Sequence, residues 1–214
     1  MAIRGDRVTL RLMTHDDVDT FVAYRSLPET LELLESRRPP PVDAVHRDVD
    51  EMAAHGCAAD GHWVHFAVTL TGSDEMIGDV GVGLSAGGAI ADIGYVMRPE
   101  YRGQGLTAEA AGLLVDHVIG HHGTHRITAE LSPLNVASMR VLESIGMSYE
   151  SRTKLSCCVD GVWEDDLRYA MLADERRAWV ARDRSPVDAV ELVEVDADNV
   201  RAWGALRTHH SQEQ

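Results

Sequence analysis

A glycine-rich stretch that runs directly into an amphipathic helix constrains the fold of this chain more than any other feature. Residues 92–97 have the composition of a β-strand that ends before Pro99, and apolar residues recur at helical spacing over residues 110–119. Gly103 and Gly105 lie between them. The first N–H groups of a helix lack internal partners, so a phosphate binds there when no side chain blocks its approach. The order strand, glycine turn, helix therefore predicts a phosphate-bearing ligand at this helix start.

The same string admits a second interpretation. Taken alone, residues 103–108 satisfy the dinucleotide-binding pattern G-x-G-x-x-G/A, and Glu130 stands roughly twenty residues beyond them. A dinucleotide turn, however, follows its strand almost directly and opens its domain. Here residues 98–102 intervene, and about ninety residues of patterned sequence come first. A dinucleotide-binding oxidoreductase is therefore a distant alternative.

Three segments, in order along the chain, resemble the GNAT N-acetyltransferases, and in particular the branch that contains the ribosomal-protein N-terminal acetyltransferases. The first carries Ile-Gly-Tyr at 93–95 and Arg-Gly-Gln-Gly at 102–105. The second, residues 135–147, is similar to the family's N-x-x-S motif with its apolar helix. The third, residues 161–172, is similar to the closing strand of that branch. Upstream of these, residues 8–12 with Asp16 and Asp17 resemble the family's opening strand and its entry to the first helix, so the resemblance extends over roughly residues 7–172.

This resemblance implies an α+β (α/β) fold of the GNAT type, in which a central, mostly antiparallel twisted sheet is splayed at the acetyl-CoA site and flanked by helices. It implies acetyl-CoA as co-substrate and direct acetyl transfer to a primary amine in a ternary complex. The third small position of the family loop is occupied by Thr107, and the threonine expected next is Ala108, so the two are exchanged. The cofactor-binding residues under this resemblance are Tyr95, Val96, Met97, Arg102, Gly103, Gln104, Gly105, Leu106, Thr107, Asn135, Ser138 and Arg140.

Catalytic candidates follow from the chemistry of acetyl transfer. An alkylamine has a pKa of about 10.4, so it must lose a proton before it attacks. We name Asp92 first and Glu130 second as the base, because both fall on strands that flank the splayed centre of the implied sheet. The tyrosine that protonates the thiolate in many GNAT enzymes is replaced here by Leu142. In the resembling branch the serine of N-x-x-S is the candidate acid, here Ser138, a position that also suits a helix-start cap.

The acceptor and the activity carry alternatives. The branch implies a protein N-terminus, while a small amine or antibiotic fits the acidic chain equally well. The missing tyrosine and the exchanged Thr107 and Ala108 motivate a non-enzymatic alternative, an acyl-CoA-binding module with a regulatory or interaction role. A homodimer that closes the acceptor cleft is compatible with the branch, although the sequence does not determine the oligomeric state.

Composition excludes several classes of function. A chain of 214 residues with 44% hydrophobic content can bury one substantial core, and no apolar run is long enough to cross a bilayer. The net charge of -15 argues against nucleic acid and membrane partners, whose recognition needs basic residues. Three cysteines and no signal-peptide pattern predict a cytoplasmic protein. We expect no metal, because no nearby cysteine or carboxylate completes a set with the clustered histidines His117, His121, His122 and His125.

The organisation expected along the chain is one acetyltransferase domain at 7–172 followed by a helical extension or linker at 173–189. The pattern of residues 190–207, Val-Glu-Leu at 190–192 followed by Asp198, Val200, Ala205 and Arg207, repeats Val-Thr-Leu at 8–10 followed by Asp16, Val18, Ala23 and Arg25. We therefore expect residues 190–214 to be the start of a truncated second GNAT-like repeat, with a chance match of two amphipathic segments as the alternative.

Periodicity predicts the principal elements inside the domain. Strand patterns at 65–70, 76–84 and 92–97 predict a central antiparallel meander. Helical patterns run from residue 16 through residue 35 and again over 42–55, separated by an irregular, proline-rich stretch.

Overall fold

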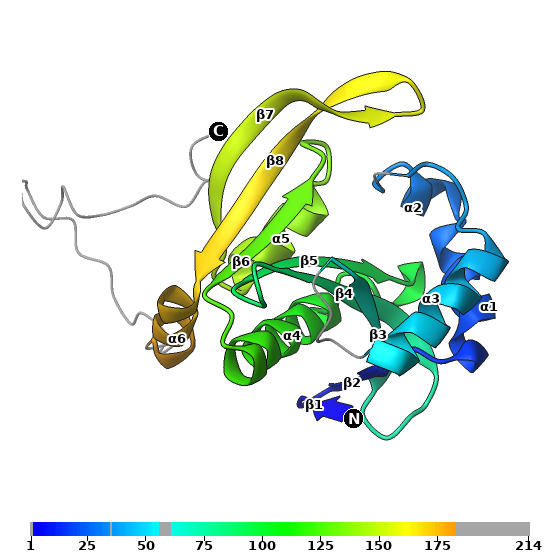
Figure 1. The fold of residues 1–214 in the computed structure, drawn as a ribbon, viewed down its shortest axis with the longest axis horizontal. Helices are drawn as coiled ribbons and strands as arrows, with labels where there is room; N and C mark the ends of the chain where they lie inside the picture. The colour runs from blue at the N-terminus through cyan, green and yellow to red at the C-terminus, as the bar shows by residue number, and fades with distance from the viewer. Residues whose placement is uncertain (1, 35, 56–60, 183–214) are drawn as a thin grey trace, which may run out of the picture.

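The computed structural model describes residues 2–34, 36–55 and 61–182. These residues form an eight-stranded sheet in the order β1-β2-β3-β4-β5-β6-β8-β7, with helices on both faces (Figure 1). The elements, in chain order, are β1 (Ala2–Arg4), β2 (Val8–Leu12), η1 (His15–Asp17), α1 (Val18–Arg25), α2 (Pro28–Leu31), α3 (Val42–His55), β3 (Trp63–Leu70), β4 (Met76–Ser85), β5 (Ile90–Met97), η3 (Pro99–Tyr101), α4 (Leu106–His122), β6 (Arg126–Leu131), α5 (Val136–Ser144), β7 (Ser148–Val159), β8 (Val162–Leu172) and α6 (Ala173–Ala181).

All neighbouring strands are antiparallel except β5 and β6. This confirms the expected mostly antiparallel sheet and its central meander, which is β3-β4-β5. The parallel pair is short: it begins at Ile90 and Arg126 and ends where Asp92 faces Thr128. Beyond that point the remaining halves of β5 and β6 are not paired with each other. The sheet is therefore splayed from Asp92 onward.

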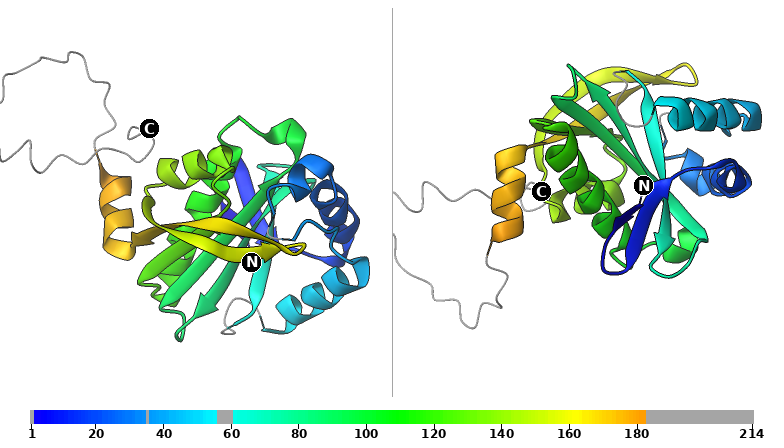
Figure 2. Two further views of the ribbon diagram at one scale, coloured as in Figure 1. Left: turned by 90° about the horizontal axis from the view of Figure 1, so that it is seen from above. Right: turned by 60° about the horizontal axis from the view of Figure 1, so that its bottom comes forward.

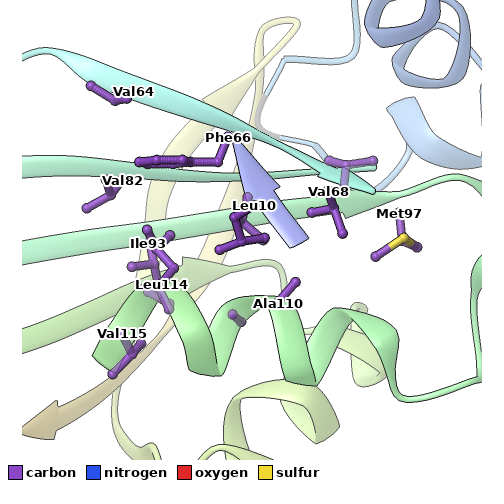
Figure 3. Close-up of a cluster of buried hydrophobic side chains, with 14 of the residues drawn as sticks. Leu10, Val64, Phe66, Val68, Val82, Ile93, Met97, Ala110, Leu114 and Val115 are labelled. Carbon is purple, nitrogen blue, oxygen red and sulfur yellow. The ribbon is translucent and has the colours of Figure 1, made fainter. Parts of the chain in front are cut away.

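Alternation along the strands assigns the two faces of the sheet. Leu10, Phe66 and Val82 point toward α4, whose Ala110 and Leu114 pack against them (Figure 3). This pattern follows from period-two strands meeting the apolar stripe of a helix. Residues in alternate positions, such as Asp79, point to the opposite face, where α1 lies. The core thus includes the layer between the sheet and α4, together with buried apolar residues of α1 and α3 such as Phe21 and Val49.

The N-terminal helical region is shorter than the sequence predicts. The expected helix over 42–55 is present as α3, but the continuous helical region up to residue 35 reduces to α1 and the four-residue α2. Pro28 begins α2, because its ring fits the first helical position but lacks an N–H for a continuous helix. The sequence prediction also lacked β1, an edge strand paired with β2.

The β7-β8 hairpin closes over the open face of the molecule. Asp160 and Gly161 form its two-residue turn, and both have left-handed backbone angles, which is the geometry that twisted hairpins favour. The end of the hairpin reaches toward the segment between α2 and α3 (Figure 1). Arg37 pairs with Glu164 at 2.6 Å and Arg38 with Asp160 at 3.1 Å. These two ion pairs connect distant parts of the chain.

Helix α6 lies at the opposite end of the molecule from α1–α3 (Figure 2). Its Arg176 is buried and donates to Asp116 at 2.7 Å and to the carbonyl of Ile145 at 2.7 Å. Trp179 lies over Gly146. The first nine residues of the predicted 173–189 extension are therefore a helix packed on α4 and α5. The expected second repeat at 190–214 lies outside the described residues. No helix in the described part of the chain is long and apolar enough to cross a bilayer.

We expect Gly146→Ala to lower the free energy of unfolding by about 2–3 kcal/mol. Gly146 has a φ of 97°, and an added Cβ would stand 2.6 Å from Cγ of Trp179. Urea unfolding followed by circular dichroism measures the change. Gly120→Ala is the control, since Gly120 lies inside α4 with open space around it. An unchanged unfolding midpoint for Gly146→Ala would contradict the packing of α6 on this turn.

Candidate active site

A cavity of about 1150 Å³ opens at the splayed part of the sheet. Its walls are the separated halves of β5 and β6, the start of α4, the start of α5 and the β7-β8 hairpin. The predicted site residues that line it are Asp92, Tyr95, Val96, Met97, Arg102, Gly103, Gly105, Thr107, Glu130, Asn135, Ser138 and Arg140. Residues from four separate segments of the sequence therefore meet at one cavity.

The turn before α4 has the geometry of an anion cradle. Gly103 and Gly105 have φ angles of 72° and 75°, a region that side-chain-bearing residues rarely adopt. The N–H groups of residues 103–108 make no hydrogen bond to a described residue outside α4. A Cβ at Gly103 would meet no atom within 4 Å, so the approach to the turn is open. Unpaired N–H groups at a helix start suit a phosphate group.

Two of the predicted cofactor residues face away from this cavity. Gln104 and Leu106 line a separate shallow depression with Arg7 instead. Arg7 donates to the carbonyl of Gln104 at 2.9 Å and to the carboxylate of Glu109 at 2.8 Å. The side chains of Gln104 and Leu106 thus face the β1-β2 side of the turn, and only their backbone groups are shared with the cradle.

Arg102 has protein partners already. Its guanidinium donates to the carbonyl of Met97 at 2.8 Å and to Oγ1 of Thr30 at 2.9 Å. It therefore connects the end of β5 to α2 and fixes the glycine turn. Arg140, by contrast, is exposed on α5 and makes no ion pair with a described residue. Its charge is available to an anionic ligand.

Asp92 and Glu130 differ in surroundings. Asp92 is half-buried at the point where the sheet splays, and its Oδ1 accepts a hydrogen bond from Thr128 at 3.0 Å. Burial raises the pKa of Asp92, the hydrogen bond from Thr128 opposes this, and the nearby charge of Glu130 raises it further. Glu130 is exposed and ion-paired with Arg168. Of the two carboxylates, only Asp92 is without an ion pair among the described residues.

A phenol and a hydroxyl meet on the other wall of the cavity. Oη of Tyr95 lies 2.8 Å from Oγ of Ser138, and Asn135 caps α5 by accepting from the N–H of Ser138 at 3.0 Å. Burial raises the pKa of Tyr95, so its phenol keeps its proton at neutral pH. Leu142, which occupies the position of the usual tyrosine, is buried in the core. The phenol of this site therefore comes from β5.

Sequence reasoning missed a buried polar cluster beside the cavity. Asp79 is fully buried on β4, where it accepts from Tyr24 at 2.6 Å, Arg25 at 2.6 Å and His65 at 3.1 Å. Arg25 and His65 also line the cavity, next to Trp63. The signal for this cluster is a charged residue inside an apolar strand pattern, because carboxylates are rarely buried without partners. The partners come from α1 and β3, which no local pattern connects to Asp79.

The histidines and cysteines form no metal site in the part of the chain that is described. His117 and His121 lie with ring centroids 4.2 Å apart, but no group of three metal-ligating side chains is arranged around an ion position. Cys157 and Cys158 are neighbours on β7. Cys57 lies outside the described residues.

Comparison with known proteins adds the family. The acetyltransferase (GNAT) domain matches residues 7–148, more than half of the chain. The chain is 36% identical over 110 residues to a probable N-acetyltransferase of Bacillus subtilis, YjcK, a match that spans 50% of this chain and 61% of that protein. It is 28% identical over 146 residues to an uncharacterized N-acetyltransferase, p20, of Bacillus licheniformis, covering 68% of this chain and 81% of the relative. The chain thus spans about three-fifths of the Bacillus subtilis relative's length.

Solved structures agree on the fold. A GNAT-family acetyltransferase from Bacillus anthracis has a TM-score of 0.71 and 26% identity, over 81% of this chain and 99% of that chain. RimJ from Mycobacterium smegmatis, solved with CoA-disulfide, has a TM-score of 0.63 and 23% identity, over 81% and 88%. The second likeness concerns the fold alone. With an antiparallel sheet, one short parallel pair and a matching domain, the dinucleotide-binding alternative has no support, and this chain belongs to the GNAT acetyltransferase family.

Proposed function

We propose that the protein transfers the acetyl group of acetyl-CoA to a primary amine, directly and within a ternary complex. The observation that supports this most is the continuity of one cavity from the glycine cradle at α4 to the gap between β5 and β6. An anion-binding helix start at one end and a half-buried carboxylate at the other are what a CoA thioester and an amine require.

The residues present fit CoA. Left-handed Gly103 and Gly105 keep the cradle free of side chains, and Arg140 provides a positive charge in a chain of net charge -15. Thr107 lines the cavity, and its hydroxyl has no hydrogen-bond partner among the described residues, so it is free to reach a phosphate. When bound, acetyl-CoA would supply the acetyl group as an activated thioester.

Two proton transfers are needed, and groups on opposite walls of the cavity carry them out. Asp92 accepts the proton from the acceptor ammonium, since it is the cavity carboxylate at the splay point and makes no ion pair with a described residue. Along residues 93–97, the edge of β5 that faces β6 has no strand partner there, so its N–H groups are available to stabilise negative charge on a carbonyl oxygen. On the other wall, the phenol of Tyr95 and the hydroxyl of Ser138 lie in hydrogen-bond contact at 2.8 Å, and the hydroxyl of Ser138 gives its proton to the leaving thiolate when Tyr95 is the donor in that contact.

A second candidate function is an acyl-CoA-binding module without turnover. The observation that favours it is the burial of Leu142 in the core, which leaves no phenol at the usual position on α5. The contact between Tyr95 and Ser138 favours the enzyme instead, because it brings a phenol to the cavity from β5. Binding of CoA without thiol release in the presence of amines would select the module.

We expect CoA to bind to the wild-type chain and Gly105→Ala to weaken that binding at least about tenfold. The substitution strains a backbone with φ of 75° at the cradle and adds a Cβ 3.3 Å from Nη2 of Arg7. Isothermal titration calorimetry with CoA measures the affinity, and thiol release from acetyl-CoA with an amine panel measures transfer. Gly120→Ala is the control, since Gly120 lies inside the helix that Gly105 precedes and has open space around it. No affinity of the wild-type chain for CoA would overturn the proposed function.

A further inference from the structure

The indole of Trp63 lies flat on a floor of three glycines. The positions that a Cβ would take at Gly81, Gly83 and Gly94 are 3.1 Å, 3.3 Å and 3.7 Å from the nearest indole atoms. Those atoms belong to both rings of the indole, so one face of the whole side chain rests on the backbone of β4 and β5. Glycine inside a strand weakens the strand and often marks a site of close approach. Three glycines on one face of two neighbouring strands therefore make up a built platform, which we call the indole platform.

The platform is part of the acceptor side of the cavity. Trp63 lines the cavity and remains 45% exposed although one face of its ring is covered. His65 stands beside it with an interplanar angle of 27° and ring centroids 6.3 Å apart. The uncovered face of the indole points away from the sheet, on the face opposite α4. A flat ligand group has room to lie on it.

Strand register places the platform opposite Asp92. Trp63 pairs with Gly83, and Gly83 pairs with Asp92, so the three residues form one row across β3, β4 and β5. Directly paired residues share a face of the sheet, and two strand spacings separate Trp63 from Asp92 by about 10 Å between backbones. An amine nitrogen held at Asp92 thus has the indole within reach of a group two or three bonds away.

The charged side chains near the platform limit which charged groups the acceptor can have. Arg25, Arg37 and Arg38, the cations on this side of the cavity, are all in ion pairs, with Asp79, Glu164 and Asp160 respectively. Asp92 makes no ion pair within the described residues. Glu32, Glu130, Glu164 and Asp166 also line the cavity. Within the row of Trp63, Gly83 and Asp92, however, the site offers one carboxylate for one ammonium, followed by an aromatic surface.

We propose that the acceptor is a primary amine that carries an aromatic ring close to the nitrogen, with the ammonium at Asp92 and the ring on the indole platform. This inference rests on the proposed acetyl transfer and names its substrate class. Offset stacking of aromatic rings adds to the burial of their area, and apolar flat groups gain most on such a surface. The ring is carried either by a small arylalkylamine or by an N-terminal aromatic residue of a peptide.

The test compares matched amines by kcat/KM. We expect wild-type protein to prefer 2-phenylethylamine over n-butylamine by about tenfold or more, and Trp63→Ala to reduce that ratio to about one. Gly81→Ala keeps the tryptophan but lifts its ring, so the ratio should fall there too. Trp163→Ala is the control, because Trp163 is a similarly exposed tryptophan on β8 that does not line the cavity. A second comparison uses two peptides, one that begins with phenylalanine and one that begins with alanine. Together the two comparisons show whether the aromatic ring belongs to a small amine or to the N-terminal residue of a peptide.

Binding separates this inference from the proposed function. Calorimetry with 2-phenylethylamine and the phenylalanine peptide on CoA-saturated wild-type and Trp63→Ala protein gives a readout without turnover. Binding that depends on Trp63 but without acetylation would support the platform and overturn the acetyl transfer. Acetylation of both members of each pair at equal kcat/KM would overturn the platform and support the transfer. Failure of both aromatic ligands to bind would overturn the platform.

Discussion

Replacing Arg25 by methionine should lower the free energy of unfolding by about 3–5 kcal/mol at neutral pH. Asp79 is fully buried, and Arg25 is its only arginine partner among the described residues, at 2.6 Å, with Tyr24 and His65 as the other hydrogen-bond donors. Without the guanidinium, a buried carboxylate loses its strongest compensation, and the remaining donors do not neutralise it. Urea unfolding of the two proteins at neutral pH measures the difference.

The sign of the pH dependence identifies the cause. In the native protein burial raises the pKa of Asp79, but Arg25 and His65 outweigh burial and hold that pKa below its ordinary value of 3.8. Asp79 therefore contributes stability that is present above the unfolded pKa and is lost as the pH falls through the folded pKa. In Arg25→Met the balance reverses, burial raises the folded pKa, and the folded state binds the proton more tightly than the unfolded state. The difference in free energy of unfolding between wild type and Arg25→Met should therefore become smaller as the pH falls from neutrality.

Two controls test this account. The double variant Arg25→Met with Asp79→Leu removes the buried charge altogether and should recover most of the lost stability. Arg177→Met breaks the exposed ion pair with Asp174 and should cost no more than about 1 kcal/mol. If the gap between wild type and Arg25→Met stays constant with pH, the loss comes from packing and not from the uncompensated charge of Asp79.

The parts of the fold that sequence predicts well are the local ones. The glycine turn and α4 are predicted together because left-handed backbone at Gly103 and Gly105 and the apolar stripe of the helix are both local. The meander is predicted because period-two patterns and turn residues repeat at short range. The order β6-β8-β7 and the edge strand β1 depend on long-range pairing, which periodicity does not encode.

In the candidate site, too, the sequence predicts the residues of local motifs but not those that depend on long-range contacts. Residues of the two motifs line the cavity, yet Gln104 and Leu106 do not, because left-handed glycines reverse the chain and turn neighbouring side chains to the other side. Asp79 and Trp63 were missed, since their partners come from other strands and from α1. The glycines at 81 and 83 on a strand are the one local signal of the indole platform.

Asp92→Asn is expected to lower kcat by about 100-fold or more, because the amide cannot accept the proton of the acceptor ammonium. Glu130→Gln should retain activity, since Glu130 is exposed and ion-paired with Arg168. Steady-state rates with acetyl-CoA and an accepted amine measure both, with CoA affinity as the check that the cofactor end is intact. A loss of the same size in Glu130→Gln alone would assign the base to Glu130.

Substitution of two neighbours of Asp92 should shift the acid limb of the pH profile of kcat, in opposite directions for the two residues. Burial raises the pKa of Asp92, the hydrogen bond from Thr128 lowers it, and the charge of Glu130 raises it. Thr128→Val removes a donor to the ionised carboxylate, so the pKa of Asp92 rises and the limb moves to higher pH. Glu130→Gln removes a like charge and releases Arg168, so the pKa falls and the limb moves to lower pH. An acid limb that stays in place in both variants would exclude Asp92 as the proton acceptor, because no other carboxylate of the described cavity has both Thr128 and Glu130 as neighbours.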